Sequence, residues 1–131
     1  MDKPEMSVVL IDDDPHSRSV FQMVMDHHKL PLFMFDNAED AIRHLHDHVP
    51  DIAVIDLFLP GLDGYQTLYR IQRDGIAPNC SFVATTAYYT NDTETETLSR
   101  GFDGYIAKPF NVENLVMYLA HIIEKRRSLG A

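Results

Sequence analysis

The sequence predicts an α/β fold in which five parallel strands form one doubly wound sheet. Five short apolar runs alternate with five segments of helical character, which is typical of this fold class. Most of the runs are continuously apolar, as expected of strands buried on both faces of a parallel sheet. A chain of 131 residues suffices for one hydrophobic core. We therefore expect a single domain over residues 1–131, with its core at about 7–125.

The predicted strands are short and are separated by segments long enough for a helical crossover. Their apolar runs are Val8–Ile11, Leu32–Phe35, Ile52–Ile55, Phe82–Ala84 and Tyr105–Ala107. Parallel strands joined in this way cross over with a right-handed sense. The smaller of the two common doubly wound layouts has strand order 2-1-3-4-5, and its ligand crevice lies at the carboxyl ends of strands one and three.

The first three predicted helices each carry an apolar stripe at helical spacing. The first follows Asp14, a typical N-cap residue, and Pro15, which suits the first helical position. Its stripe runs from Val20 to Met25, and the stripe of the second helix runs from Ala38 to Leu45. The third predicted helix spans about Gly64 to Asp74.

The fourth and fifth predicted helices differ in quality. Residues 91–99 read NDTETETLS, with three threonines and only Leu98 clearly apolar. Threonine loses rotamer freedom in a helix, so we expect this helix to be short or mobile. The last helix has the best-formed apolar stripe of the chain, from Val112 to Ile123, behind an Asn111 cap.

Composition excludes several classes of function. The formal net charge is −9, from 20 acidic and 11 basic residues, which argues against direct binding of nucleic acid. We interpret the basic cluster Lys125–Arg127 as complementing the dipole of its own helix. No apolar run approaches the roughly 20 residues of a membrane helix, and the N-terminus does not resemble a signal peptide. The single cysteine, Cys80, cannot form an internal disulfide, so we expect a soluble, cytoplasmic protein.

An acidic cluster stands where the fold predicts a ligand site. Asp12, Asp13 and Asp14 follow the first strand, and Asp56 ends the third. Close carboxylates repel by roughly 1 kcal/mol per pair in water and by about 4 kcal/mol at an intermediate dielectric. A cation would offset this repulsion, and a set of oxygen ligands suits Mg²⁺. The simpler interpretation, that these aspartates are turn and cap residues, fits Asp14 best.

Four separated motifs resemble the response regulator receiver family, the chemotaxis-type phosphoacceptor domains of two-component systems. In chain order they are VVLIDDD, DLFLPGLDG, ATTA and GYIAKPF, and the resemblance covers the chain from Val8 to about Glu124. It implies a flavodoxin-like (βα)5 receiver fold and a cytoplasmic phosphoprotein that acts in phosphorelay signal transduction. It also implies Mg²⁺, or Mn²⁺, as cofactor. A receiver is not an enzyme, although it assists its own phosphorylation and dephosphorylation.

The resemblance assigns roles to the acidic residues. Asp56 matches the phosphoacceptor, a carboxylate nucleophile that forms an acyl phosphate. Asp13 would bind the metal directly, and Asp12 would act mainly through a metal-bound water. The backbone carbonyl of Phe58 would complete the protein ligands together with Asp56.

The resemblance also assigns residues that contact the phosphoryl oxygens. Lys108 matches the lysine that pairs with them, and the Lys108–Pro109 bond is expected to be cis. Thr86 matches the hydroxyl that turns toward them. We choose Thr86 over its neighbour Thr85 because Ala87 follows it, matching the small residue of the family.

Three aromatic residues are candidates for switching and tuning. Tyr105 matches the aromatic residue that rotates inward on phosphorylation, which would change the face formed by helix four, strand five and helix five. The simpler interpretation of Tyr105 is packing on an edge strand. Phe58 and Tyr88 replace polar residues of fast-cycling members, and we expect them to slow dephosphorylation by obstructing hydrolytic water.

The resemblance implies a partner histidine kinase or histidine phosphotransfer protein as phosphodonor, and an unidentified downstream protein. A homodimer through the face of helices four and five stays open. The main alternative is a receiver-like scaffold that is not phosphorylated, which the presence of Asp13, Asp56, Thr86 and Lys108 disfavours. An aspartate-based phosphohydrolase is a second alternative, but it would require an aspartate at position 58, which is Phe58.

Overall fold

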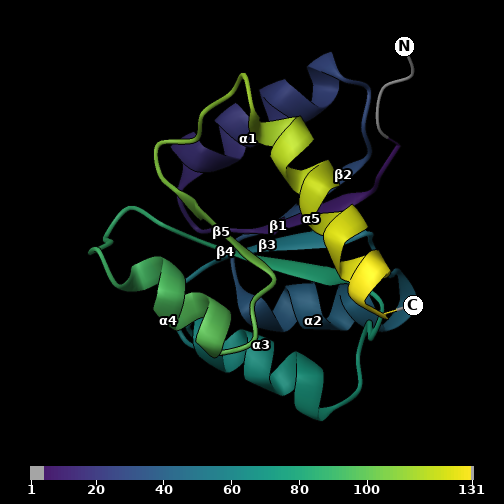
Figure 1. Ribbon diagram of the computed structural model, residues 1–131, viewed down its shortest axis with the longest axis vertical. Coiled ribbons are helices and arrows are strands. Elements are labelled where there is room, and N and C mark those ends of the chain that lie inside the picture. The colour runs from purple at the N-terminus through teal and green to yellow at the C-terminus, as the bar shows by residue number, and fades with distance from the viewer. Residues whose placement is uncertain (1–4, 131) are drawn as a thin grey trace.

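The computed structural model describes residues 5–130, which form five strands that alternate with five helices (Figure 1). The strands are β1 Val8–Ile11, β2 Leu32–Phe35, β3 Ile52–Asp56, β4 Ser81–Thr86 and β5 Gly104–Ala107. They form one parallel sheet in the order β2-β1-β3-β4-β5. The predicted fold class and strand order are therefore confirmed.

The helices cover both faces of the sheet. They are α1 Pro15–His27, α2 Ala38–Asp47, α3 Gly64–Arg73, α4 Thr93–Ser99 and α5 Leu115–Gly130. Figure 1 shows α1 and α5 on one side of the sheet and α2, α3 and α4 on the other. None of the helices within residues 5–130 is long and apolar enough to cross a membrane.

The inner strands β1 and β3 bury side chains on both faces of the sheet. Along β1, Val9 and Ile11 join the core under α2 and α3, whereas Val8 and Leu10 join the core under α1 and α5. β3 alternates in the same way. Because successive side chains of a strand point to opposite faces, this double burial explains the continuous apolar runs.

The second strand differs from the expectation of burial on both faces. β2 lies at the edge of the sheet and pairs only with β1 among the described strands. Phe33 on β2 is 54% exposed, and its ring lies 4.7 Å from the ring of His44 on α2. An apolar run thus identifies a strand but does not place it at the centre of a sheet.

The helix ends follow the sequence with one exception. Asp14 caps α1 by accepting the N–H of His16 at 3.1 Å. Asn111 instead caps a turn, because its side chain accepts the N–H of Glu113 at 3.1 Å and α5 begins only at Leu115. Val112, which we placed on the apolar stripe, is consequently exposed.

The fourth helix is short, as its threonines predicted. α4 has seven residues, and Asp92 at its N-terminus makes no capping hydrogen bond with its side chain. The buried residue of this helix is Thr97, whose hydroxyl donates to the carbonyl of Glu94 at 2.8 Å, whereas Leu98 is exposed. The helix therefore has little apolar anchorage of its own.

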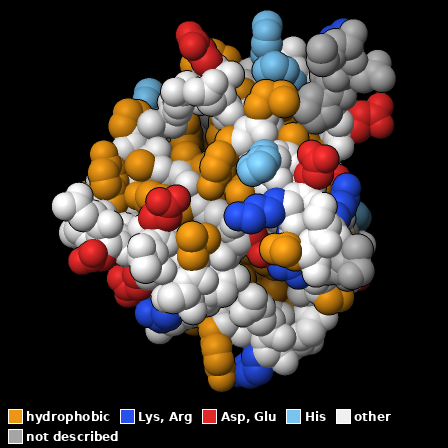
Figure 2. Space-filling model, in the orientation of Figure 1, with side chains coloured by type: hydrophobic (Ala, Val, Ile, Leu, Met, Phe, Trp, Pro, Cys, Tyr) orange, Lys and Arg blue, Asp and Glu red, His pale blue; other side chains and the backbone are white. Residues whose placement is uncertain are grey.

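Two of the basic residues near the end of α5 also contact the loops that precede strands, in addition to their predicted role at the helix C-terminus. Arg126 donates to both oxygens of Asp103 at 3.1 Å and to the carbonyl of Pro78 at 2.8 Å. Arg127 donates to Asp51 at 2.8 Å. On the face shown in Figure 2, the described basic side chains are scattered among acidic and apolar ones and form no broad basic surface.

Candidate functional site

Three carboxylates meet at the carboxyl ends of β1 and β3. These strands are neighbours with Ile11 opposite Ile55, so the residues that follow, Asp12 and Asp56, lie next to each other. Asp12, Asp13 and Asp56 each offer an oxygen, and these oxygens lie within 4.8 Å of one another. Asp12 and Asp56 are buried, whereas Asp13 is exposed. The cluster is therefore open to solvent on one side only.

Lys108 connects this cluster to the end of β5. Its Nζ lies 2.8 Å from Oδ2 of Asp12 and 2.9 Å from Oδ2 of Asp56. The backbone N–H of Lys108 donates to the carbonyl of Thr86 at 3.0 Å, which fixes the start of the loop relative to β4. The Lys108–Pro109 peptide bond is cis. One ammonium group thus contacts two buried acidic side chains.

The charges of the cluster are only partly compensated. Burial raises the pKa of Asp12 to about 6, against the opposing hydrogen bond from Lys108, and the nearby charge of Asp56 adds to the rise. Burial alone would lower the pKa of Lys108, but its hydrogen bonds to Asp12 and Asp56 outweigh burial and raise it. The cluster therefore places three acidic side chains beside one lysine.

The donor set fits a hard divalent cation. Oδ1 of Asp12 accepts the N–H of Asp14 at 2.9 Å. Oδ2 of Asp12 is buried and pairs with Lys108 Nζ at 2.8 Å. Magnesium is bound through oxygen, commonly by one or two carboxylates with waters filling the remaining positions. The cluster supplies such oxygens and has negative charge left to be neutralised.

The two adjacent threonines at the end of β4 make different contacts. Thr85 lies opposite Asp56 in the sheet, and its hydroxyl donates to the carbonyl of Ile106 at 2.7 Å. Thr86 is buried, and its hydroxyl oxygen accepts the N–H of Tyr88 at 3.0 Å. Thr85 is thus bonded to β5. The hydroxyl proton of Thr86 has no acceptor among residues 5–130, so Thr86 can donate to another group.

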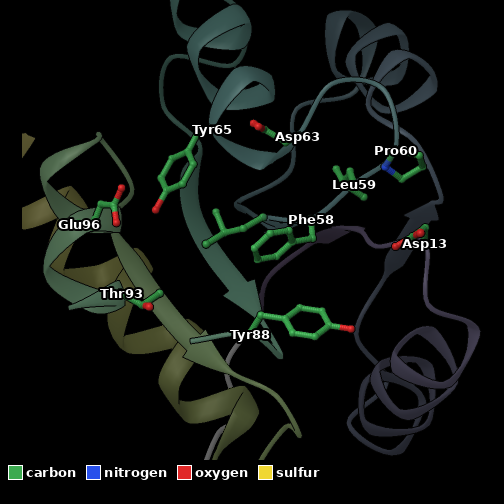
Figure 3. Close-up of a pocket in the computed structure, with 10 residues that line it drawn as sticks. Asp13, Phe58, Leu59, Pro60, Asp63, Tyr65, Tyr88, Thr93 and Glu96 are labelled. Atoms are coloured by element: carbon green, nitrogen blue, oxygen red, sulfur yellow. The ribbon is translucent and has the colours of Figure 1, made fainter. Parts of the chain in front are cut away.

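Two aromatic rings flank the cluster. The N–H of Phe58 donates to Oδ1 of Asp56 at 2.9 Å, so Phe58 stands directly beside this carboxylate. The ring of Phe58 meets the ring of Tyr88 edge to face, with centroids 5.3 Å apart. Both rings line a cleft that also includes Asp13 (Figure 3). They are exposed by 58% and 76%, so they form one wall of the cleft that leads toward Asp13.

Tyr105 occupies the edge strand β5 and packs against the core beneath α3. Its hydroxyl is buried, and among the described residues it has no hydrogen-bond partner. A buried polar group without a partner costs roughly 1–3 kcal/mol. The hydroxyl of Tyr105 therefore destabilises the position that its side chain occupies.

Sequence reasoning missed two residues that shape the site. Arg18 on α1 donates to the backbone carbonyl of Asp12 at 2.9 Å and so holds the loop after β1. Gly64 begins α3 so close to β3 that a Cβ would lie 2.7 Å from the carbonyl oxygen of Asp56. The glycine that closes the DLFLPGLDG segment could have indicated this close approach.

Comparison with known proteins identifies the family. The family model for the response regulator receiver domain matches residues 8–120. The phosphate regulon transcriptional regulatory protein PhoB of Pseudomonas aeruginosa is 25% identical over 119 residues, which cover 91% of this chain and 52% of PhoB. This chain thus spans about half the length of that relative.

Solved structures show the same fold. A CheY-like response regulator receiver domain protein from Methanospirillum hungatei has a TM-score of 0.82 and 18% identity, covering 95% of this chain and 98% of that one. The receiver domain of the sensor histidine kinase PA1611 from Pseudomonas aeruginosa has a TM-score of 0.81 and 23% identity, covering 92% and 99%. In that second structure a magnesium ion is coordinated in the active site cleft.

Proposed function

The chain belongs to the response regulator receiver domain family, and from this premise we propose that it accepts a phosphoryl group on Asp56 in a two-component phosphorelay. One observation carries the proposal. The Asp56 carboxylate lies at the end of the central strand β3, within 2.9 Å of Lys108 Nζ and beside Asp12 and Asp13. A nucleophile, a cationic group and a candidate metal site thus share one edge of the sheet.

Phosphoryl transfer depends mainly on alignment and on neutralising the charge of the transferred group. A carboxylate oxygen of Asp56 would attack the phosphorus of a phosphohistidine on a partner kinase or phosphotransfer protein. The bond between phosphorus and the imidazole nitrogen then breaks, and the imidazole leaves. Lys108, which already contacts Asp56, would pair with the phosphoryl oxygens, and the free hydroxyl proton of Thr86 would donate to them.

We assign the divalent cation, Mg²⁺ or Mn²⁺, to Asp12, Asp13, Asp56 and the backbone carbonyl of Phe58. The oxygens of the three aspartates lie within 4.8 Å of one another. Among the described residues, Lys108 alone pairs with them, which supports a further cation here. When bound, such an ion neutralises charge on the phosphoryl oxygens. Asp12 and Asp13 would serve only to bind the cation, whereas Asp56 would bind it and also supply the nucleophile.

Output is proposed to arise at the face formed by α4, β5 and α5. Tyr105 lies on β5 within this face, and its unsatisfied hydroxyl supports a side chain that changes position when Asp56 is modified. The weakly anchored α4 suits the same role, because moving elements come from the less stable parts of a fold. The downstream partner would bind this face.

The aromatic pair Phe58 and Tyr88 is proposed to prolong the life of the phosphorylated state. Hydrolysis needs a water molecule in line with the bond between phosphorus and Asp56. Both rings stand at the cleft and contact each other, so they would restrict the approach of that water.

Beryllofluoride, which mimics an aspartyl phosphate, provides the test. With Mg²⁺ and beryllofluoride we expect the thermal unfolding midpoint of the protein to rise, because a ligand at 100 times its Kd stabilises the native state by about 2.7 kcal/mol. The Asp56→Asn variant should show no rise, and an Asp36→Asn variant at an exposed position should respond like the wild type. A wild-type protein that does not respond to Mg²⁺ and beryllofluoride would contradict the proposal.

A further inference from the structure

The hydroxyl of Tyr118, on α5, makes two hydrogen bonds to the backbone of Tyr105. It accepts the N–H of Tyr105 at 2.9 Å and donates to the carbonyl of Tyr105 at 3.0 Å. A single hydroxyl can do both because it carries one donor proton and two acceptor lone pairs. One residue of a strand is thus held at two points by a side chain from a helix.

The position of Tyr105 explains why these backbone groups are available. β5 is an edge strand that pairs only with β4 among the described strands, with Tyr105 opposite Ala84. Alternate residues of an edge strand direct their N–H and C=O away from the sheet, where no neighbouring strand can pair with them. At Tyr105 the hydroxyl of Tyr118 takes the place of that missing strand.

Gly104 makes the approach of Tyr118 feasible. A Cβ at residue 104 would lie 2.8 Å from the hydroxyl oxygen of Tyr118 and 2.9 Å from Cδ1 of Ile122. Both contacts are shorter than side chains normally tolerate. Burial also raises the pKa of Tyr118, against the opposing hydrogen bond from Tyr105. The phenol therefore keeps the proton that it donates.

The backbone and the side chain of Tyr105 differ in their hydrogen bonding. Its N–H and C=O are both bonded to α5, whereas its own hydroxyl is buried without a partner among the described residues. Any displacement of the backbone at Tyr105 therefore acts on α5 through these two hydrogen bonds.

We propose that Tyr118 is a positioning residue that couples the candidate switch residue Tyr105 on β5 to helix α5. The inference rests on the proposed function, because it assigns a route by which modification of Asp56 reaches the output face. Tyr118 touches neither Asp56 nor Lys108 in any described hydrogen bond or ion pair. Its removal should therefore leave phosphoryl chemistry intact and weaken the response of α5.

The test compares Tyr118→Phe with wild-type protein by amide hydrogen exchange and by NMR, with and without Mg²⁺ and beryllofluoride. We expect the Tyr105 amide to exchange about tenfold faster in the variant, as loss of a hydrogen bond implies, while amides of β1 and β3 keep their protection. On addition of beryllofluoride, residues 56–58 should shift as in the wild type. The shifts of residues 115–122 should fall by at least half.

Two further variants sharpen this test. Tyr69→Phe removes the hydroxyl of a tyrosine that is 65% exposed on α3, and it should behave as wild type. Gly104→Ala displaces the Tyr118 hydroxyl sterically and should reproduce the effects at Tyr105 and α5. Unchanged exchange at Tyr105, or a full α5 response, in both Tyr118→Phe and Gly104→Ala would overturn the inference. A wild-type protein that does not respond at residues 56–58 would instead contradict the proposed function itself.

Discussion

Asp12 is the residue at which stability and function oppose each other most clearly. Its carboxylate is fully buried, and burial raises its pKa to about 6 from an ordinary value of 3.8. The native protein thus holds a proton on Asp12 more tightly than the unfolded chain does. The resulting stabilisation is complete below about pH 4 and is lost as the pH rises to about 6.

We therefore predict that Asp12→Asn stabilises the metal-free protein. At pH 7.5 in the presence of a chelator, its free energy of unfolding should exceed that of the wild type by about 1–3 kcal/mol. The same variant should bind Mg²⁺ more weakly. Urea denaturation and calorimetric titration with MgCl₂ measure the two quantities. Lower stability of Asp12→Asn under these conditions would contradict the prediction. It would show that the ion pair with Lys108 outweighs the cost of burying the Asp12 carboxylate.

The aromatic pair at the cleft gives a second prediction for single residues. A Phe58→Asn, Tyr88→Glu double variant should lose its phosphoryl group at least several-fold faster than the wild type, because both rings line the cleft. The decay of phosphorylated protein after removal of the donor measures this rate. Tyr89→Glu is a matched control, since Tyr89 is also exposed but does not line that cleft. Equal rates of phosphoryl loss in the double variant and the wild type would contradict the proposal that Phe58 and Tyr88 slow dephosphorylation.

At the scale of elements, α4 and α5 should differ in local stability. α4 has seven residues and no side-chain cap, whereas α5 has 16 residues and buries Leu115, Leu119 and Ile122. Hydrogen exchange followed by mass spectrometry should show faster exchange in Thr93–Ser99 than in Leu115–Ile123. Equal protection of the two segments would count against α4 as the element that is remodelled.

The end of α5 provides a prediction with internal controls, because Lys125, Arg126 and Arg127 are adjacent but make different contacts. Arg126→Ala should lower the free energy of unfolding by about 1–2 kcal/mol, since it breaks the paired bonds to Asp103. Arg127→Ala should cost less than about 1 kcal/mol, because that pair is more exposed. Lys125→Ala should have little effect. Equal losses in all three variants, measured by urea denaturation, would indicate a dipole effect instead.

At the scale of the whole molecule, hydrophobic patterning is enough to predict the fold class, whereas the receiver fold is implied by the family resemblance. The continuous apolar runs of Val8–Ile11 and Ile52–Ile55 reflect burial on both faces of the sheet. Because parallel strands end at one edge, strand order 2-1-3-4-5 predicts that Asp12 and Asp56 lie together. Fold class and the acidic cluster are thus the properties that local sequence carries most directly.

Contacts between distant segments could not be predicted in this way. The exposure of Phe33 depends on β2 lying at the sheet edge, and an apolar run does not encode that position. The bonds from Tyr118 to Tyr105 and from Arg126 to Asp103 join residues whose spacing has no local signature. Such contacts depend on how α5 packs against the sheet, which is a property of the assembled chain.

The most direct test of the central claim is the intact mass of the protein after incubation with acetyl phosphate. We predict the addition of one phosphoryl group to the wild type in the presence of Mg²⁺, no addition when Mg²⁺ is chelated, and none in Asp56→Asn. The exposed Asp36 offers a matched Asp36→Asn control that should be modified like the wild type. An unmodified wild-type protein with Mg²⁺ present, or a modified Asp56→Asn variant, would contradict Asp56 as the phosphoacceptor. The first of these results would favour a scaffold that acts through protein contacts alone.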